Sequence, residues 1–413
     1  MTKDTKVMTH TLRRLRRSGL VLVALVSVLA AAPAAQQPSE IQSWSIPGWT
    51  FTPGITIGTL FDTNVAIAGP DVNGDTASDT MLQMEPFGQL EFRSPRTTFS
   101  SGYRGSLHRY FDLSALNGND HRAYVDLRER LTRRVLLFVT NDYQQVATTD
   151  RLELNDLPFQ RLGARHNAAT GGVEARLTKS LDLAVRYENG WVRFERTDPA
   201  DPRTGGMVHG VRSDLTHRFT ERLSFGGTYA LRRSNMNEGT RQQTFQEAGG
   251  VLRYSVAQRT TVEVAGGLSH LNDASRSLSQ TGSFVEGEVS HRAQRASLGA
   301  KYNRGYRASF GFGGATQNDQ VSGYIRMPLS RNRLYVQESA SWLRSRPLDP
   351  VDVLTFERRS TWINSTVGYA LQRWVRLEGY WSFSRQDTPR PGGLINRHII
   401  GAQIAISEPV RIR

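Results

Sequence analysis

The sequence predicts an all-β chain that closes into a transmembrane, antiparallel, up-and-down β-barrel of about 18 strands. Three observations predict this fold class: an export signal, a short turn that recurs along the chain, and strands whose side chains alternate between apolar and polar. A mean hydropathy of −0.45 and 22% charged residues exclude a bundle of transmembrane helices. The absence of cysteine excludes a disulfide scaffold.

The first 35 residues predict a secretory signal peptide. A basic segment that ends at Arg17 precedes an uncharged apolar run over residues 19–31, and small residues follow up to Ala35. This order is typical of a cleaved export signal. We therefore expect a signal peptide over residues 1–35, a short periplasmic N-terminal extension over 36–48 and an outer-membrane barrel over 49–413. The alternative is a retained N-terminal anchor.

A short turn recurs every 36 to 46 residues. Its eight occurrences are marked by Pro95, Thr132, Thr178, Thr220, Ala257, Ala293, Ser330 and Gln372. Longer, polar connections lie between these turns, and short periplasmic turns with longer extracellular loops are typical of outer-membrane barrels. If both termini are periplasmic, eight such turns imply 18 strands. Residues 141–167 are irregular and could hide or lose a hairpin, which would leave 16 strands.

The segments between the turns alternate in polarity. In residues 82–92 the even positions are mainly apolar and most odd positions are Gln or Glu, and residues 181–188, 223–232 and 375–382 repeat the pattern. Strands of about ten residues match a tilted bilayer crossing. Aromatic residues that flank the turns predict an interfacial girdle: Phe92, Phe99, Phe219, Phe225, Tyr254, Tyr335, Tyr369 and Trp374. A soluble periplasmic all-β protein is the alternative fold.

The polar faces of these strands carry charged side chains that a soluble sandwich could not bury without partners. We expect them to line a water-filled lumen, because side chains do not fill a barrel of 16 to 18 strands. The lumen-lining candidates are Glu85, Glu91, Arg104, Arg122, Asp126, Arg128, Arg186, Glu188, Arg232, Arg253, Glu263, Arg326, Arg376 and Glu378. Their arginines could favour small anionic solutes. Alternatively, arginines and carboxylates neutralise one another across strands.

No motif predicts a catalytic residue, a metal site or a cofactor, and we predict that the protein is not an enzyme. Residues 71–75 begin like a calcium loop, but Thr76 and Leu82 replace the glycine and glutamate that such a loop needs. His108 shares a polar face with Ser106, but the sequence places no acid beside them. The balance of 52 basic and 38 acidic residues is spread along the chain, so we predict no nucleic-acid partner.

Residues 53–65 (PGITIGTLFDTNV) supply the one local motif that resembles a known family. An apolar strand, an aromatic residue and Asp-x-Asn-Val resemble the start of outer-membrane β-barrels found with exopolysaccharide genes, the beta-barrel porin 2 or EpsL-like proteins. The resemblance implies an outer-membrane barrel that passes or assists secreted polysaccharide. The C-terminus departs from the wider outer-membrane pattern, because the chain ends at Arg413 and not on an aromatic residue.

The predicted function is a porin-like channel, or one associated with exopolysaccharide export, in the outer membrane. Its expected partners are outer-membrane lipid and lipopolysaccharide, the barrel assembly machinery, and secreted polysaccharide or small anionic solutes. Two alternatives stay open: a non-conducting structural barrel that binds surface components, and a soluble periplasmic binding protein. Residues 141–167 could decide whether the lumen is open, if they fold inward.

Overall fold

The structure is a computed structural model. It describes residues 48–69, 76–152, 159–195, 205–236, 239, 241–293, 295–310, 314–330, 333–348, 356–387 and 393–412. The predicted signal peptide, nearly all of the N-terminal extension and the calcium-like residues 71–75 lie outside these ranges. Within them, no helix is long and apolar enough to cross a membrane.

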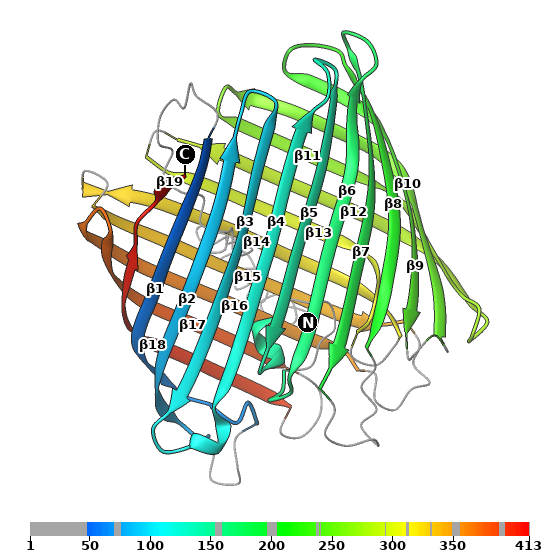
Figure 1. The fold of residues 1–413 in the computed structure, drawn as a ribbon. Coiled ribbons are helices and arrows are strands. Elements are labelled where there is room, and N and C mark those ends of the chain that lie inside the picture. Colours follow the sequence, from blue (N-terminus) through cyan, green and yellow to red (C-terminus); the bar gives the residue numbers. More distant parts are fainter. Residues whose placement is uncertain are drawn as a thin grey trace, which may run out of the picture.

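The chain forms one antiparallel sheet that closes on itself, as Figure 1 shows. From β1 to β18 each strand pairs with the next along the chain, and β1 closes the barrel by pairing with β18 and the short β19. The strands are β1 (Gly48–Asp62), β2 (Asp79–Arg93), β3 (Thr97–Tyr110), β4 (Gly118–Arg130), β5 (Val135–Val146), β6 (Ala164–Arg176), β7 (Leu181–Phe194), β8 (Gly206–Arg218), β9 (Leu223–Met236), β10 (Arg241–Ala257), β11 (Thr260–Asp273), β12 (Leu278–Arg292), β13 (Ser297–Ala308), β14 (Ala315–Leu329), β15 (Leu334–Pro347), β16 (Arg358–Gln372), β17 (Val375–Asp387), β18 (Leu394–Ser407) and β19 (Val410–Ile412). Two short 3₁₀ helices, η1 (Ser114–Leu116) and η2 (Thr149–Arg151), lie in connections.

The predicted barrel of 18 long strands is confirmed, and the alternative of 16 is wrong. The eight predicted turns all lie between an even-numbered strand and the next one, at one end of the barrel. Residues 141–167 hide no further hairpin among the described residues. Their two ends belong to β5 and β6, and η2 lies in the connection between these strands.

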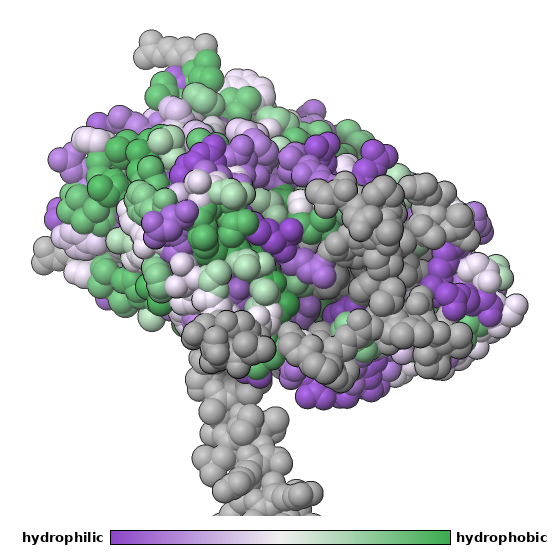
Figure 2. Space-filling view, turned by 90° about the horizontal axis from the view of Figure 1, so that it is seen from below, coloured by the Kyte–Doolittle hydropathy of each residue, from purple (hydrophilic) through white to green (hydrophobic). Residues whose placement is uncertain are grey.

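Strand register assigns each side chain to one of two faces. In β1, Trp49, Phe51, Ile57 and Phe61 are exposed, and the even-numbered residues between them face the lumen. Alternate residues of a strand point to opposite faces, so paired residues on neighbouring strands extend this apolar outer face around the barrel. Figure 2 also shows hydrophobic residues gathered on the left side of the molecule. Such an outer face matches the hydrocarbon of a membrane.

The aromatic girdle is predicted correctly for most of its members but not for Tyr335. Its hydroxyl donates a hydrogen bond to Glu378 (2.5 Å), one of the lumen-facing carboxylates, so the ring points inward. The register of β15 places Tyr335 on the opposite face from Trp342, which is exposed. A position next to a turn does not fix the face of a side chain.

One seam of the barrel is incomplete. β12 and β13 pair from Arg292 with Ser297 up to Val285 with Arg304. Beyond that point, among the described residues, β12 pairs only with β11 and β13 only with β14. Tyr306 is buried, and its hydroxyl occupies the space that a Cβ on Gly282 would need, so only glycine leaves room for it. The end of β13 thereby turns toward the lumen.

An apolar cluster fills the lumen at this place. It joins residues from β7, β9, β10 and β11 to the inward-turned end of β13 and the start of β14. Its members are Val192, Met236, Phe245, Leu271, Tyr306, Ala308, Phe310 and Ala315.

Candidate functional site: the barrel lumen

The described parts of the connection between β5 and β6 lie inside the lumen and contact the wall formed by β16, β17 and β18. Arg397 of β18, which is 1% exposed, forms ion pairs with Asp62 of β1 (2.6 Å) and with Asp150 of η2 (2.8 Å). A buried guanidinium needs such partners, because its desolvation is costly. Here it joins the connection to the wall at the point where β1 closes against β18.

Aromatic and amide groups add to this contact. The indole N–H of Trp362 donates to the carbonyl oxygen of Asp150 (2.9 Å), and the backbone N–H of Phe159 donates to Oε1 of Gln386 (2.9 Å). The rings of Phe159 and Trp362 lie 5.4 Å apart. The described part of the connection therefore packs on β16, β17 and β18. We call these contacts the loop anchor.

The carboxyl group of Asp150 is ionised in this setting. Burial alone would raise its pKa, but the guanidinium groups of Arg397 and Arg151 outweigh burial and hold the pKa below its ordinary value. An ionised Asp150 is the state that the ion pair with Arg397 requires.

The structure brings together three residues that the sequence analysis left apart. His108 Nε2 lies 2.9 Å from Ser106 Oγ, and His108 Nδ1 lies 3.8 Å from Asp120 Oδ2. No sequence spacing indicates this acid, because it is the pairing of β4 with β3 that presents Asp120 beside His108 and Ser106. Arg151 lies within hydrogen-bonding distance of His108 Nε2 (3.0 Å) and of Asp120 (2.6 Å). This occupies the nitrogen that a general base would need, so the group extends the loop anchor.

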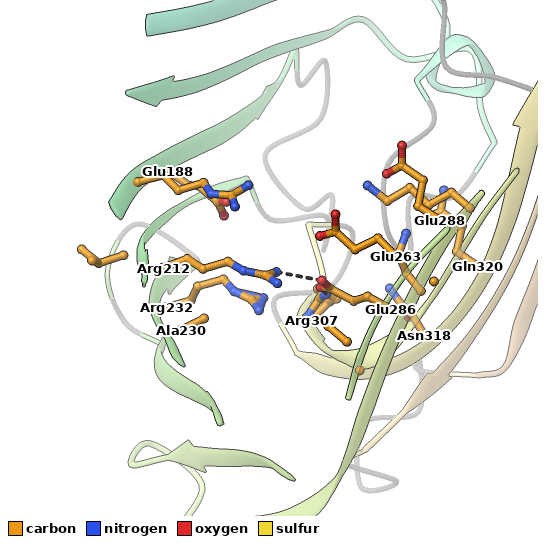
Figure 3. A pocket seen from close by; sticks show the side chains of 17 residues that line it. Glu188, Arg212, Ala230, Arg232, Glu263, Glu286, Glu288, Arg307, Asn318 and Gln320 are labelled. Atoms are coloured by element: carbon orange, nitrogen blue, oxygen red, sulfur yellow. Dashed lines mark hydrogen bonds and ion pairs between the residues drawn. The ribbon is translucent and has the colours of Figure 1, made fainter. Parts of the chain in front are cut away.

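A second group of charged residues lies across the lumen, as Figure 3 shows. Arg212 of β8 forms ion pairs with Asp214 (3.1 Å) and with Glu286 of β12 (2.8 Å). Glu247 of β10 accepts hydrogen bonds from Arg232 and from Arg307 of β13 (2.8 Å for Arg307). We call this group the charged crossbar, because two of its pairs, Arg212 with Glu286 and Arg307 with Glu247, join strands that are not neighbours.

The inward turn of β13 explains how Arg307 joins the charged crossbar. Arg307 lies beyond the last residue of β13 that pairs with β12, so its side chain reaches Glu247 and comes within 3.8 Å of Glu286. Strand pairing alone would place Arg307 beside β12 and β14. The tertiary position of this strand end therefore sets the charge pattern of the lumen.

A cavity of about 450 Å³ adjoins the charged crossbar. Its lining is mainly charged or polar, and Figure 3 shows these side chains converging from opposite walls. Residues from both walls include Arg186, Glu188, Arg212, Arg232, Glu263, Glu286, Glu288, Lys301 and Arg307. A cavity with this lining suits hydrophilic solutes. Among the described residues, no group of acidic and histidine side chains is arranged to hold a metal ion.

The fourteen predicted lumen residues all lie on the lumen face of the observed register, opposite the exposed apolar side chains. Most of their arginines form ion pairs with nearby carboxylates. The pairs are Arg104 with Glu85, Arg122 with Asp142, Arg128 with Asp126, Arg186 with Asp214, Arg232 with Glu247, Arg253 with Glu263 and Arg376 with Glu378. Glu91 accepts a hydrogen bond from Gln89, Glu188 lines the cavity, and Arg326 pairs in register with Ser297.

The sequence analysis missed residues that carry the two charged groups. Arg212, Glu247, Glu286 and Arg307 form the charged crossbar, and Arg397 joins the loop anchor to the wall. Alternation within their strands would have placed them on the lumen face. Their partners come from distant parts of the chain, and no sequence pattern gives those pairings.

A closed antiparallel barrel with an apolar outer face and a charged interior is the architecture of outer-membrane β-barrels. The protein is a barrel of this class and belongs in the outer membrane.

Comparisons with solved structures find outer-membrane barrels. OpdQ of Pseudomonas aeruginosa is 10% identical, with 88% of this chain and 98% of that chain covered and a TM-score of 0.41. The siderophore receptor PirA of Pseudomonas aeruginosa is 7% identical, with 89% and 81% covered and a TM-score of 0.42. The outer-membrane protein OpdK of Pseudomonas aeruginosa is 12% identical, with 88% and 99% covered and a TM-score of 0.40. No family model and no curated protein matches the sequence.

Proposed function

We propose that the protein is a porin-like channel that lets small hydrophilic solutes cross the outer membrane. The observation that carries this proposal is the cavity of about 450 Å³ beside the charged crossbar, inside a barrel of 18 strands. An apolar outer face keeps the barrel in lipid, and charged side chains keep its interior wetted. The role requires no catalytic residue or cofactor, and we propose no enzymatic activity.

The ion pairs of the lumen suggest weak ion selectivity. Arg186, Arg212 and Arg232 face the cavity, but each also forms an ion pair with a carboxylate. Glu188, Glu263 and Glu288 face the same cavity. The field in the lumen is therefore mixed in sign, and the fourteen predicted residues act as a balanced lining rather than a ring that admits only anions.

Single-channel recording in planar bilayers tests the proposed channel. We expect the folded protein to conduct stably and to show a reversal potential near zero across a gradient of potassium chloride. A barrel that shifts its electrophoretic mobility on heating, as a folded barrel does, yet conducts nothing would contradict the proposal. A strong preference for anions would contradict the balanced lining and leave the channel intact.

The segment 53–65 favours a second candidate, a barrel that assists the export of secreted polysaccharide. Its motif supports this candidate by resemblance, although Asp62 and Asn64 of the motif also have internal roles: Asp62 pairs with Arg397, and Asn64 donates to the backbone of Asn396 (2.9 Å). Neutral oligosaccharides added to one side should interrupt the ionic current if they enter the lumen. Currents that stay uninterrupted at millimolar concentrations would argue against this candidate.

The remaining expected partners follow from the same proposal. A predicted signal over residues 1–35 would deliver the chain to the periplasm, and assembly machinery would then fold it into the membrane. Fractionation of cells tests this step, because an outer-membrane barrel needs detergent for extraction. Release into the aqueous fraction would favour the soluble alternative.

A further inference from the structure

A group of arginines lies on the outer face of the barrel near its loop end, which is the end opposite the eight short turns. Arg304, Arg344, Arg346 and Arg359 come from the loop-end halves of β13, β15 and β16, and they surround Asp319 and Glu357. Arg344 pairs in register with Asp319, two residues from the pairing of the exposed Trp342 with Val321, so it shares their outward face. We call this group of six the outer arginine patch.

The two carboxylates hold the guanidinium groups in place. Glu357 accepts from Arg344 Nε and Nη2 (2.9 and 2.8 Å) and from Arg359 Nη2 (2.9 Å). Asp319 lies 2.6 Å from Arg346 Nη2 and 3.5 Å from Arg304 Nη1. Hydrogen bonds from Arg344 hold the pKa of Glu357 below its usual range, so this carboxylate is ionised. The arginines are therefore fixed before a ligand arrives.

The patch keeps a positive charge that nothing inside it cancels. Four guanidinium groups face two carboxylates, which leaves a net charge of +2 for the six side chains. Arg344 and Arg359 are direct partners across β15 and β16, an arrangement of like charges that is unfavourable without a bound anion or a carboxylate between them. Arg359 is 55% exposed, so its guanidinium group is accessible. Asp387 of β17 pairs in register with Arg359 on the same face and reduces the local surplus of positive charge.

Outward arginines also occur elsewhere at this end of the barrel. Arg165 of β6 and Arg193 of β7 pair in register, and Arg165 forms an ion pair with Glu195 (3.1 Å). The outer arginine patch differs because it joins four arginines and two carboxylates. Immediately toward the membrane on the same face lies Trp342, which is 37% exposed beside Val321 and Thr361. Fixed cations next to an exposed aromatic side chain match a ligand with an anionic head and an apolar body.

We propose that the outer arginine patch binds the phosphate groups of a phosphorylated glycolipid in the outer leaflet, with the acyl chains against Trp342. This inference rests on the proposed function and its orientation, in which the longer loops face the outer leaflet. Arginine suits the task because its planar fork of N–H groups binds phosphate oxygens in pairs. A free phosphate ion could use the same groups, but it would gain nothing from Trp342.

Lipid binding to the full-length protein in neutral detergent tests the proposal, with bis-phosphorylated lipid A as the probe and the same lipid without phosphates as the comparison. The double variant Arg344→Gln/Arg346→Gln should raise the dissociation constant for the phosphorylated lipid by about tenfold or more. The control Arg233→Gln changes an exposed arginine of β9 outside the patch and should leave binding unchanged. If the double variant does not fold, Arg359→Gln gives the same comparison.

Three results would overturn the proposal: equal binding of the two lipids, equal binding by the double variant, or displacement of the lipid by an equal concentration of inorganic phosphate. The last result would indicate a site for free anions. Conductance measured on the same samples separates this inference from the proposed channel. A barrel that binds the lipid but does not conduct would refute the channel and keep the patch, and the reverse result would do the opposite.

Discussion

The loop anchor and the charged crossbar both place arginine between two carboxylates, but their surroundings differ. Arg397 of the loop anchor is 1% exposed, and its partners Asp62 and Asp150 are buried as well. Arg212 of the charged crossbar is 17% exposed, its partner Glu286 is 21% exposed, and both line the cavity. The ion pairs of the loop anchor are buried, whereas those of the charged crossbar are partly exposed to the water in the lumen.

This difference in burial indicates that the two groups of ion pairs have different roles. A sealed ion pair contributes to the position of the β5–β6 connection, and losing one member leaves a buried charge without a partner. A wetted ion pair contributes less to stability, because water screens it and can replace a missing partner. We therefore expect substitutions in the loop anchor to alter the position of the β5–β6 connection inside the lumen. Changes in the charged crossbar should alter ion passage.

Replacing Arg397 should have the largest effect. Arg397→Met leaves the carboxylates of Asp62 and Asp150 buried without their cation, which should lower the free energy of unfolding by about 3–5 kcal/mol. Unfolding in urea, followed by the change in electrophoretic mobility on heating, measures this loss. The connection should also leave the wall and change the single-channel conductance. A variant as stable as the parent would contradict the importance of the loop anchor.

Replacing Arg212 should have a smaller effect on stability and a clear one on selectivity. Arg212→Gln removes charged hydrogen bonds to Asp214 and Glu286, which typically contribute about 1.5–3 kcal/mol, less here because the pair is partly solvated. The released carboxylates should shift the reversal potential toward cation preference. Arg253→Gln is the matched control, because its pair with Glu263 lies on the same lumen face but Arg253 is 54% exposed. An identical shift in both variants would contradict a special role for the charged crossbar.

Replacing Trp362 by Phe tests one hydrogen bond of the loop anchor. The variant keeps a ring against Phe159 but loses the donor to the carbonyl oxygen of Asp150, so we expect a loss of about 0.5–1.5 kcal/mol. More frequent fluctuations of the single-channel current would show the loosened connection directly. Arg212→Gln should lack these fluctuations if the two groups act separately.

Acidification should have the smallest effect on stability and conductance, because Asp150 stays ionised over most of the pH range. Because the pKa of Asp150 is lowered in the folded protein, its contribution to stability is complete above the ordinary pKa of 3.8 and is lost as the pH falls through the lower, folded value. Conductance should therefore be unaffected by this group from pH 8 to about pH 5 and change only below about pH 4. The variant Asp150→Asn should lack that acid transition. A transition near pH 6 that Asp150→Asn removes would contradict the lowered pKa.

The prediction for residues 141–167 shows where sequence reasoning ends. The sequence pattern identified these residues as irregular, and we expected that they could fold inward. In the structure η2 does lie against β18. It could not name Arg397, Trp362 or Gln386 as the groups that hold them, because these lie more than 200 residues away along the chain. The group of Ser106, His108 and Asp120 was missed for a related reason, since it depends on the register between β3 and β4.

The sequence by itself determined the barrel. Alternation with a period of two assigns side chains to lipid or lumen, and eight short turns set 18 strands, because both are local properties of the chain. Only the tertiary structure decided how the lumen is divided. The departure of β13 from β12, the contact of Tyr306 with Gly282, and the pairing of Arg397 with Asp150 depend on the packing of distant segments. Such contacts are selected by burial and charge pairing in three dimensions, for which a strand pattern carries no signal.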